Sequence, residues 1–265
     1  MLVSTYIHIN LFKINGKVLF IKINLNYNMK IISILLCILG PLALILFLKE
    51  RVKAHSSKAL ILKSLTSSIF VLLAISSLSN EIGLEKLAFC GLIIAGLVFC
   101  LLGDIWLDLK FIHLQDEDLF MYAGFAMFAI GNLFYILAII LTFADFTQPL
   151  YIVIPIILGI ILGIANGYND SVLELNYGKF KKVVIAYAIV VYSFLFLSVS
   201  FVILNNFTNM IVNFMFVGSL LFLVSDLILS KTLFGENYDK PSYIVLNHVF
   251  YYLAEFIIAV SLYLI

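Results

Sequence analysis

The sequence predicts an all-α membrane protein, a polytopic bundle of about eight transmembrane helices. Three observations support this fold class. Of the 265 residues, 64% are hydrophobic and only 12% are charged, and the mean hydropathy is +1.16. The apolar residues form runs of about 20 residues, the length at which a helix crosses a bilayer. These runs lack the period-2 alternation of a transmembrane β-barrel.

Eight apolar runs predict the membrane spans. In order they are 30–48, 59–78, 87–107, 119–143, 150–165, 183–204, 211–229 and 243–265. Each run is predicted to be helical, because a helix satisfies its own backbone hydrogen bonds in lipid. The connectors between them are short and polar: KERVKAHSSK, NEIGLEK, DLKFIHLQDED, ADFTQP, NGYNDSVLELNYGKFKK, NNFTN and KTLFGENYDKP. No soluble domain fits between two spans, so residues 29–265 are predicted to form a single domain.

The first 28 residues differ from the rest of the chain. They are rich in Asn, Ile and Lys, contain no span, and lack the order of basic, apolar and small residues that marks a signal peptide. Met29 then opens directly onto an apolar run, as a natural start would. We expect residues 1–28 to be a disordered leader that the protein does not need.

The loop charges predict the orientation in the membrane. Ten Lys and Arg residues lie in the first, third, fifth and seventh connectors, and at most five lie on the opposite side. Positive loops stay in the cytoplasm. We therefore expect a multi-pass protein, of the bacterial inner-membrane or endoplasmic-reticulum type, with both termini outside the cytoplasm.

Several classes of function have no support in the sequence. All three cysteines lie within predicted spans, which argues against a disulfide framework. The net charge of +1 gives no indication of nucleic-acid binding. No Walker loop, G-x-S-x-G, H-E-x-x-H or G-x-G-x-x-G motif is present, and no cluster of metal ligands is visible, so no cofactor is expected. The oligomeric state stays open.

Four charged residues interrupt the apolar spans: Lys63, Asp104, Asp226 and Glu255. A charge at the bilayer centre costs roughly 2.5–3.5 kcal/mol on insertion scales, so such residues usually face a bundle interior, form pairs or do chemistry. They are the first candidates for a functional site.

Asp104 and Asp226 share a sequence context. Each follows a small residue directly (Gly103 or Ser225) and has a glycine eight positions upstream and a leucine three positions downstream. Small residues seven apart lie along one stripe of a helix and let a neighbouring helix approach closely. Each Asp is therefore expected beside a tight seam between helices and away from lipid.

The two Asp motifs lie four spans apart, so their helices cross the membrane in the same direction. This spacing suggests two parallel four-helix halves related by an axis along the membrane normal. The two carboxyls would then come together near that axis.

Further polar residues are placed at similar depth. Lys63, Tyr187 and His248 lie about one turn inside spans that are entered from the predicted cytoplasmic side, while Asn132 and Glu255 lie deeper. With Ser225 and Tyr252 they complete the candidate set around a polar pocket open to the cytoplasmic half of the bilayer.

Structural interpretations of these residues stay open beside the functional one. Lys63 and His248 could lie at the interface, Asn132 could join two helices, and Tyr187, Tyr251 and Tyr252 could belong to an aromatic belt. The two Asp residues could form a buried pair that fixes the fold. We favour function for them, because Ser or Asn would do that structural task at lower cost.

Five segments carry a resemblance to a known family. They are LILKSLTSS in the second span, LLGDIWL in the third, F-x-x-G-N-L-F-Y in the fourth, LLFLVSDLIL in the seventh and YYLAEFIIAVS in the eighth. The sequence resembles the YhhN, or lysoplasmalogenase-like, family of eight-span membrane proteins, over most of the chain after Met29. The two Asp motifs are the most specific part of the likeness.

The chain departs from the family pattern at three positions. The family usually has His where this chain has Asn132, Gln where it has Glu255, and Lys-Pro where it has Lys63-Ser64. A protonated Glu255 could replace Gln as donor and acceptor. Asn132 cannot transfer protons as His does, which puts in question whether the activity is retained.

The resemblance implies a hydrolase that cleaves the vinyl ether bond of lysoplasmalogens, which are lysophospholipids of the bilayer, to a fatty aldehyde and a glycerophospho-alcohol. This chemistry suits a carboxyl pair. A protonated Asp can donate its proton to the β-carbon of the vinyl ether, and an ionised Asp can stabilise the resulting cation and orient water, as paired carboxyls do in glycosidases. Asp104 and Asp226 would be these catalytic groups, and Lys63 could meet the lipid phosphate.

Two alternatives belong to other functional classes. A proton-coupled transporter also uses intramembrane carboxyls at the interface between repeats. However, the four prolines all lie far from both Asp motifs, so no span shows the break expected of an unwound transport site. A non-catalytic lipid-binding protein is the second alternative, which Asn132 in place of His keeps open.

Overall fold

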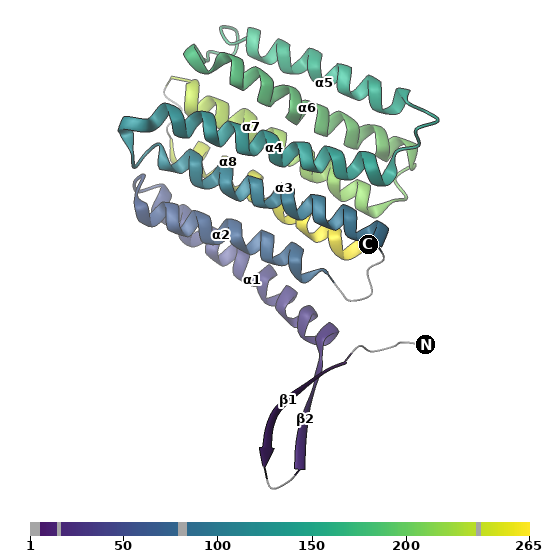
Figure 1. Ribbon diagram of the computed structural model, residues 1–265. Helices are drawn as coiled ribbons and strands as arrows, with labels where there is room; N and C mark the ends of the chain where they lie inside the picture. Colours follow the sequence, from purple (N-terminus) through teal and green to yellow (C-terminus); the bar gives the residue numbers. More distant parts are fainter. Residues whose placement is uncertain (1–5, 15–16, 79–83, 237–239) are drawn as a thin grey trace.

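The computed structural model describes residues 6–14, 17–78, 84–236 and 240–265, and eight long helices dominate it (Figure 1). They are α1 (Leu25–Arg51), α2 (Ser57–Ser76), α3 (Leu84–Leu109), α4 (Glu117–Phe143), α5 (Leu150–Tyr168), α6 (Lys181–Leu204), α7 (Met210–Phe234) and α8 (Pro241–Ser261). All eight are long and apolar enough to cross a membrane. The protein is therefore a multi-pass integral membrane protein with the predicted all-α fold.

Local sequence signals begin several of these helices. Ser56 caps α2 by accepting a hydrogen bond from the backbone N–H of Ala59 at 3.2 Å, and Asn209 caps α7 in the same way. Pro241 occupies the first turn of α8, where its missing N–H costs nothing. Such caps satisfy backbone donors that the first helical turn leaves unpaired.

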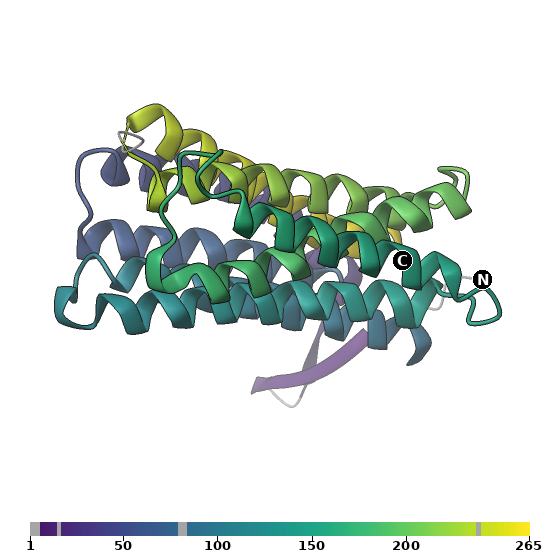
Figure 2. The ribbon, with the colours of Figure 1, turned by 90° about the horizontal axis from the view of Figure 1, so that it is seen from above.

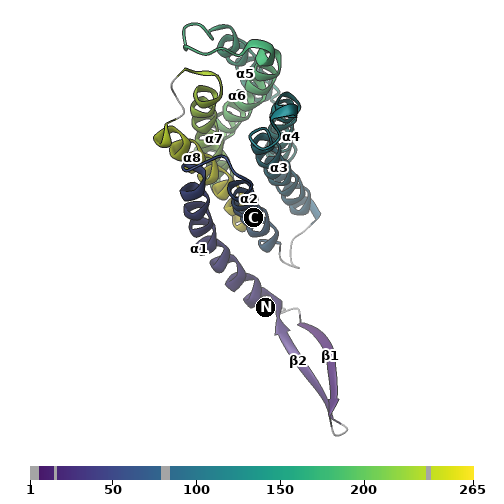
Figure 3. The same ribbon diagram turned by 90° about the vertical axis from the view of Figure 1, so that its left-hand side faces the viewer.

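Consecutive helices pack as four hairpins: α1 with α2, α3 with α4, α5 with α6, and α7 with α8. Figures 1 and 3 show α1–α2 at one end of the row of hairpins and α5–α6 at the other. The windows of α1 and α5 that could span the membrane are only 22% buried. Their outer faces are therefore the surfaces offered to lipid.

The contacts between hairpins agree with the two predicted parallel halves. In the first half α2 contacts α3, and in the second α6 contacts α7. Across the halves, α2 contacts α8 and α6 contacts α4, so α2 and α6 occupy equivalent positions. The last helix, α8, also contacts α1 and α3 and thereby joins the second half to the first.

The glycines before the two Asp residues lie in tight seams, as predicted. A Cβ atom added to Gly103 would lie 2.9 Å from the ring of Phe128 on α4, and one added to Gly218 would lie 2.6 Å from Ile258 on α8. Only hydrogen at these positions allows α3 to approach α4, and α7 to approach α8, this closely. Each Asp helix is thus held by its own hairpin partner.

A third seam joins α5 to α6 by a different stripe. Gly159, Gly163 and Gly167 recur every four residues along α5 and pack against Ser193, Ile189 and Ile185 of α6. This is the small-residue spacing that lets transmembrane helices pack backbone to backbone. It attaches α5 to one side of α6, while α6, which carries Tyr187, contacts α4 and α7 in the rest of the bundle.

The amino-terminal region differs in part from the expectation. Two antiparallel strands, β1 (Tyr6–Ile14) and β2 (Lys17–Asn24), precede α1 and extend away from the bundle (Figure 1). The first helix begins at Leu25, upstream of the predicted start of the first span. Residues 1–5 and 15–16 of the expected leader lie outside the described residues, and its dispensability stays a prediction.

The carboxyl-terminal ends of α1, α3, α5 and α7 all lie at one end of the bundle, on the left of Figure 1, and Figure 2 shows the same helices from above. This is the end that the charge count predicts to be cytoplasmic. The third helix continues to Leu109, two residues beyond its predicted end. Asp108, assigned by the sequence to the edge of a span, therefore lies inside α3.

Candidate functional site

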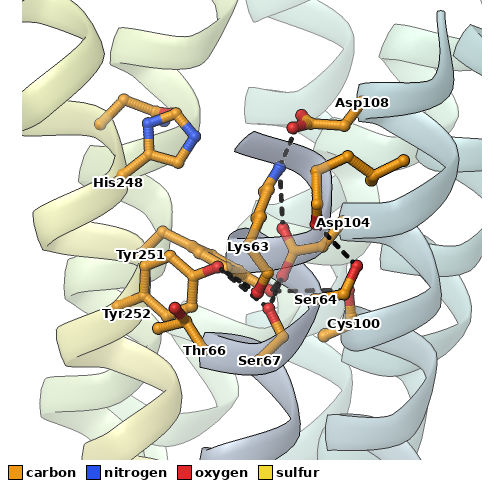
Figure 4. A network of polar contacts seen from close by, with 12 residues as sticks. Lys63, Ser64, Thr66, Ser67, Cys100, Asp104, Asp108, His248, Tyr251 and Tyr252 are labelled. Atoms are coloured by element: carbon orange, nitrogen blue, oxygen red, sulfur yellow. Dashed lines mark hydrogen bonds and ion pairs between the residues drawn. The ribbon is translucent and has the colours of Figure 1, made fainter. Parts of the chain in front are cut away.

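Asp104 lies at the centre of a buried polar network, which Figure 4 shows. Its carboxyl is almost completely buried. One oxygen, Oδ2, accepts hydrogen bonds from Ser67 at 2.6 Å and from Tyr251 at 2.8 Å. The other, Oδ1, lies 3.1 Å from the ammonium of Lys63. These are the partners of an ionised carboxylate, because one is a cation and the other two donate hydrogen.

Lys63 joins Asp104 to a second buried carboxylate. Its ammonium lies 3.0 Å from Asp108, one helical turn along α3. Asp108 also accepts hydrogen bonds from both terminal nitrogens of Arg51, at 3.1 and 3.3 Å. All four side chains are at least nine-tenths buried, so the ion pairs are shielded from water. Lys63 is thus committed to two carboxylates and does not extend to the interface.

A cavity of about 260 Å³ lies beside this network at the predicted cytoplasmic end of the bundle. Its walls come from the end of α1, from α2, α3 and α4, and from α7 and α8. The polar side chains that line it are Arg51, His55, Lys63, Asp104, Asp108, Lys110, Ser225, Asp226, Thr232, Asn247, His248 and Tyr251. Leucine, isoleucine and phenylalanine side chains complete the lining, as in a pocket for a lipid with a polar head group.

Asp226 lines the same cavity from α7 but has different partners. The phenol of Tyr187 on α6 donates a hydrogen bond to its Oδ2 at 2.7 Å. No ion pair to Asp226 is present among the described residues. The two Asp residues therefore face one cavity in unequal environments, one beside a cation and one beside a phenol, and no hydrogen bond of the described structure joins them.

Of three further predicted residues, Ser225 and His248 line the cavity, while Tyr252 lies outside its lining. Ser225 accepts a hydrogen bond from Asn247 of α8 and closes the α7–α8 seam beside Asp226. His248 lines the cavity, with its Nδ1 2.7 Å from the carbonyl of Ile244. The hydroxyl of Tyr252 lies 3.0 Å from the hydroxyl of Ser67, which in turn donates to Asp104, so Tyr252 acts on Asp104 through Ser67.

Asn132 and Glu255 lie deeper, outside the lining of the cavity. Glu255 accepts a hydrogen bond from Tyr135 at 2.6 Å, and the amide of Asn132 donates to the carbonyl of Phe128. One side-chain oxygen of each residue is buried without a hydrogen-bond partner in the described structure. Two of the three positions that differ from the family pattern thus lie outside the cavity and form no hydrogen bond to either Asp residue in the described structure.

Sequence reasoning missed several groups of the site. Asp108 and Ser67 each lie four residues after a predicted site residue, on the same helix face. The same reasoning applies to Asn247 and Tyr251, which share a face of α8 with Glu255. The i, i+4 spacing could have identified them. Arg51 and Lys110 gave no such signal, because helix-end cations are common at membrane interfaces.

Nothing in the described residues suggests a resident metal. No three His, Cys, Asp or Glu side chains of the described chain lie close enough together to hold an ion. The donor set of the cavity instead consists of cations, hydroxyls and carboxyls, which suits proton transfer and the binding of an anionic group.

Comparison with known proteins gives one match. The model of the YhhN family matches residues 58–262, which include both Asp motifs and seven of the eight long helices. No curated protein and no solved structure matches the chain.

Proposed function

The chain belongs to the YhhN family, and we propose that it is a membrane-embedded hydrolase that cleaves the vinyl ether bond of lysoplasmalogens, releasing a fatty aldehyde and a glycerophospho-alcohol. One observation carries the proposal: Asp104 and Asp226 line the same cavity but have unequal partners. Acid-catalysed cleavage of a vinyl ether needs one carboxyl that holds a proton and one that does not.

The partners assign the two roles. Asp226 has no cation among its described contacts and would be the acid, with Tyr187 holding its carboxyl in place. Asp104, paired with Lys63 and bonded by two hydroxyls, would remain ionised. Carboxyl pairs in other hydrolases divide their work through the same difference in surroundings.

The reaction balances with water as the only co-reactant. Asp226 donates its proton to the β-carbon of the vinyl ether, and the double bond becomes an oxocarbenium ion. Asp104 stabilises that cation and orients a water molecule, whose oxygen bonds to the carbon attached to the ether oxygen. The water gives up a proton, which restores Asp226 to its acid form. The resulting hemiacetal breaks into an aldehyde and the free glycerol hydroxyl.

Two of the three departures from the family pattern, Asn132 and Glu255, do not touch this chemistry. Asn132 and Glu255 lie outside the lining of the cavity and bond to Phe128 and Tyr135. Neither role assigned to the two Asp residues requires a proton from Asn132. The replacement of His by Asn is therefore compatible with a functioning acid pair.

The course of the Asp helices favours a hydrolase over a carrier. α3 and α7 are continuous through Asp104 and Asp226. Carriers commonly bind their cargo where helices are broken and backbone groups become free.

We expect the purified protein in detergent to release fatty aldehyde from a lysolipid that carries a vinyl ether chain. A hydrolase needs no ion gradient, so turnover should occur in micelles. The matched control is the lysolipid with a saturated ether chain, which lacks the β-carbon that accepts the proton. Aldehyde is measured by coupling to an aldehyde dehydrogenase.

Two results would contradict the proposal. A carrier would give no aldehyde in micelles but gradient-dependent lipid flux in liposomes. A non-catalytic binding protein would bind both lysolipids and transform neither.

The predicted orientation would put the cavity in the cytoplasmic leaflet, because the cavity lies at the end of the bundle that holds most loop cations. We expect a reporter fused after Ile265 and a reporter inserted in the α5–α6 connector to lie on opposite sides of the membrane, with the latter in the cytoplasm. A cytoplasmic carboxyl terminus would move the cavity to the other leaflet.

A further inference from the structure

Two cations line the part of the cavity that lies at the helix ends, which we call its mouth and which comprises Arg51, His55, Lys110 and Phe111. Arg51 is the last residue of α1, and Lys110 directly follows the last residue of α3. The guanidinium carbon of Arg51 and the ammonium of Lys110 each lie 4.6 Å from the centre of the Phe111 ring. His55 stacks on the same ring at 3.8 Å between ring centres. All four residues line the cavity.

The charges at this mouth are not balanced. The carboxylates of Asp104 and Asp108 are engaged by Lys63 and Arg51. Lys110 forms no ion pair in the described structure, where its ammonium contacts the sulfur of Met121 at 3.2 Å. The Nε of Arg51 is buried and has no hydrogen-bond partner there. The ammonium of Lys110 therefore has no anionic partner in the described structure, and Arg51 keeps one N–H free to donate.

Burial and two neighbouring cations act against the charged form of Lys110. The pKa of Lys110 is lowered to about 8, mainly by burial; Glu117 and Asp108 oppose this lowering, and the positive charges of Arg51 and Lys63 add to it. A buried cation next to another cation is costly, and a bound anion would offset that cost.

The position of the two cations indicates which anion. They lie at helix ends, where the head groups of a bilayer meet water. Lys110 is six residues beyond Asp104 on α3, a separation of about 9 Å along a helix. The glycerol backbone that separates the phosphate from the ether bond in a lysoplasmalogen spans a comparable length. A lipid with its phosphate at the mouth would place its ether bond near the two Asp residues.

We propose that Lys110 and Arg51, which both pack on Phe111 in the lining of the cavity, bind a phosphate group, in the first place the phosphate of a single-chain phospholipid. The inference rests on the proposed function for its choice of lipid. It assigns the phosphate first to Lys110, which forms no ion pair in the described structure, and then to the Nε–H of Arg51, whose terminal nitrogens stay on Asp108. Lys63 already lies between Asp104 and Asp108. Guanidinium and ammonium groups are the usual partners of phosphate oxygens.

Binding of two non-hydrolysable lipids tests the site without turnover. The probes are a saturated lysophosphatidylethanolamine and a monoacylglycerol of the same chain, which lacks the phosphate, titrated in a non-ionic detergent. We expect Lys110→Met to weaken binding of the lysophospholipid by about 10-fold, the effect of one charge-assisted contact. Binding of the monoacylglycerol should not change. Methionine keeps the length of the side chain and its packing on Phe111.

Two further variants serve as controls. Lys110→Arg keeps the charge and should retain the preference for the lysophospholipid. Lys58→Met removes an exposed lysine that pairs with Glu50 on the same side of the bundle, and it should change neither affinity. An unchanged preference in Lys110→Met, or an equal loss for both lipids, would overturn the inference.

Inorganic phosphate distinguishes the two sources of the group. A lipid-specific site prefers the lysophospholipid in the wild type and responds little to free phosphate. If free phosphate alone raises the unfolding temperature of the wild type but not of Lys110→Met, and no lipid preference exists, the site takes a soluble phosphate. If neither probe depends on Lys110, there is no phosphate site.

The outcome is separable from that of the proposed function. Aldehyde release with a Lys110-independent lipid preference would remove the phosphate site and leave the hydrolase. A lipid preference that depends on Lys110, without aldehyde release, would support the phosphate site and contradict the hydrolase.

The lipid preference should depend on pH. The cationic form of Lys110 is lost as the pH rises through about 8, so the advantage of the lysophospholipid should fall between pH 7 and pH 9. The charged groups that face Lys110 are Arg51, Lys63, Asp108 and Glu117. Lys110→Arg should hold the advantage constant over this interval, since arginine stays protonated. A decline of equal size in Lys110→Arg would assign the titration to another group.

Discussion

Replacement of Asp226 by Asn is expected to lower aldehyde release by about 10²–10⁴-fold, the usual contribution of a positioned acid or base. Asparagine can still accept the hydrogen bond from Tyr187, so the fold around α7 should persist. It has no proton to give to carbon. The unfolding temperature in detergent should therefore stay near that of the wild type while turnover is lost.

Replacement of Asp104 by Asn should lower turnover by a similar factor, with a loss of stability as well. Its two carboxylate oxygens accept hydrogen bonds from Ser67 and Tyr251 and pair with the ammonium of Lys63. The amide nitrogen of an asparagine would face a hydrogen-bond donor in either orientation of the side chain. The double variant should be little slower than either single variant, since groups that act as one unit are not additive.

Asp118→Asn is the matched control for both substitutions. Asp118 lies on the same side of the bundle, in the first turn of α4, where it is exposed and pairs with Lys179. Its loss should leave turnover within about two-fold of the wild type, because exposed ion pairs contribute little. Normal turnover in Asp226→Asn and Asp104→Asn would show that the site is wrongly assigned. Failure of both variants to fold would assign the two Asp residues to the fold instead.

Replacement of Lys63 by Met is expected to give the largest loss of stability, about 3–5 kcal/mol, as when one partner of a buried ion pair is removed. Asp108 would keep Arg51, but Asp104 would lose its only described cation. The free energy of unfolding in mixed micelles measures the effect. Lys63→Arg, which keeps the charge, should lose less.

A double-mutant cycle separates this effect from a loss of packing. Adding Asp104→Asn to Lys63→Met removes the unpaired charge, so the double variant should be more stable than the sum of the two single losses predicts. Lys58→Met, on the same helix but exposed, should lie within about 0.5 kcal/mol of the wild type. A loss below about 1 kcal/mol in Lys63→Met would mean that water or lipid already screens Asp104.

The spans and the identity of the two Asp residues were predictable from the sequence, because both depend on local information. A run of apolar residues must be helical in lipid, wherever its neighbours are. An Asp inside such a run is conspicuous for the same reason, and the glycine stripes beside Asp104 and Asp226 indicated the seams that now hold them. The parallel halves followed from the spacing of the motifs.

The partners of each carboxyl were not predictable, since they come from helices far apart in the chain. Ser67 and Tyr251 are 184 residues apart in the sequence, yet both donate to the same oxygen of Asp104. The length of α3 also mattered: two further residues carried Asp108 into the bundle and gave Lys63 a second carboxylate. Hydropathy alone cannot tell whether a helix ends at the membrane interface or continues beyond it.

The sequence by itself thus determined the class of the protein, its eight spans and the two residues on which its proposed chemistry depends. The tertiary structure alone decided that Asp104 is paired with a cation while Asp226 meets a phenol, that Asn132 and Glu255 lie outside the cavity, and that Arg51 and Lys110 meet at its mouth. The physical reason is that composition decides whether a segment enters lipid, whereas the state of a buried carboxyl depends on which side chains the packing of other helices brings within hydrogen-bonding distance.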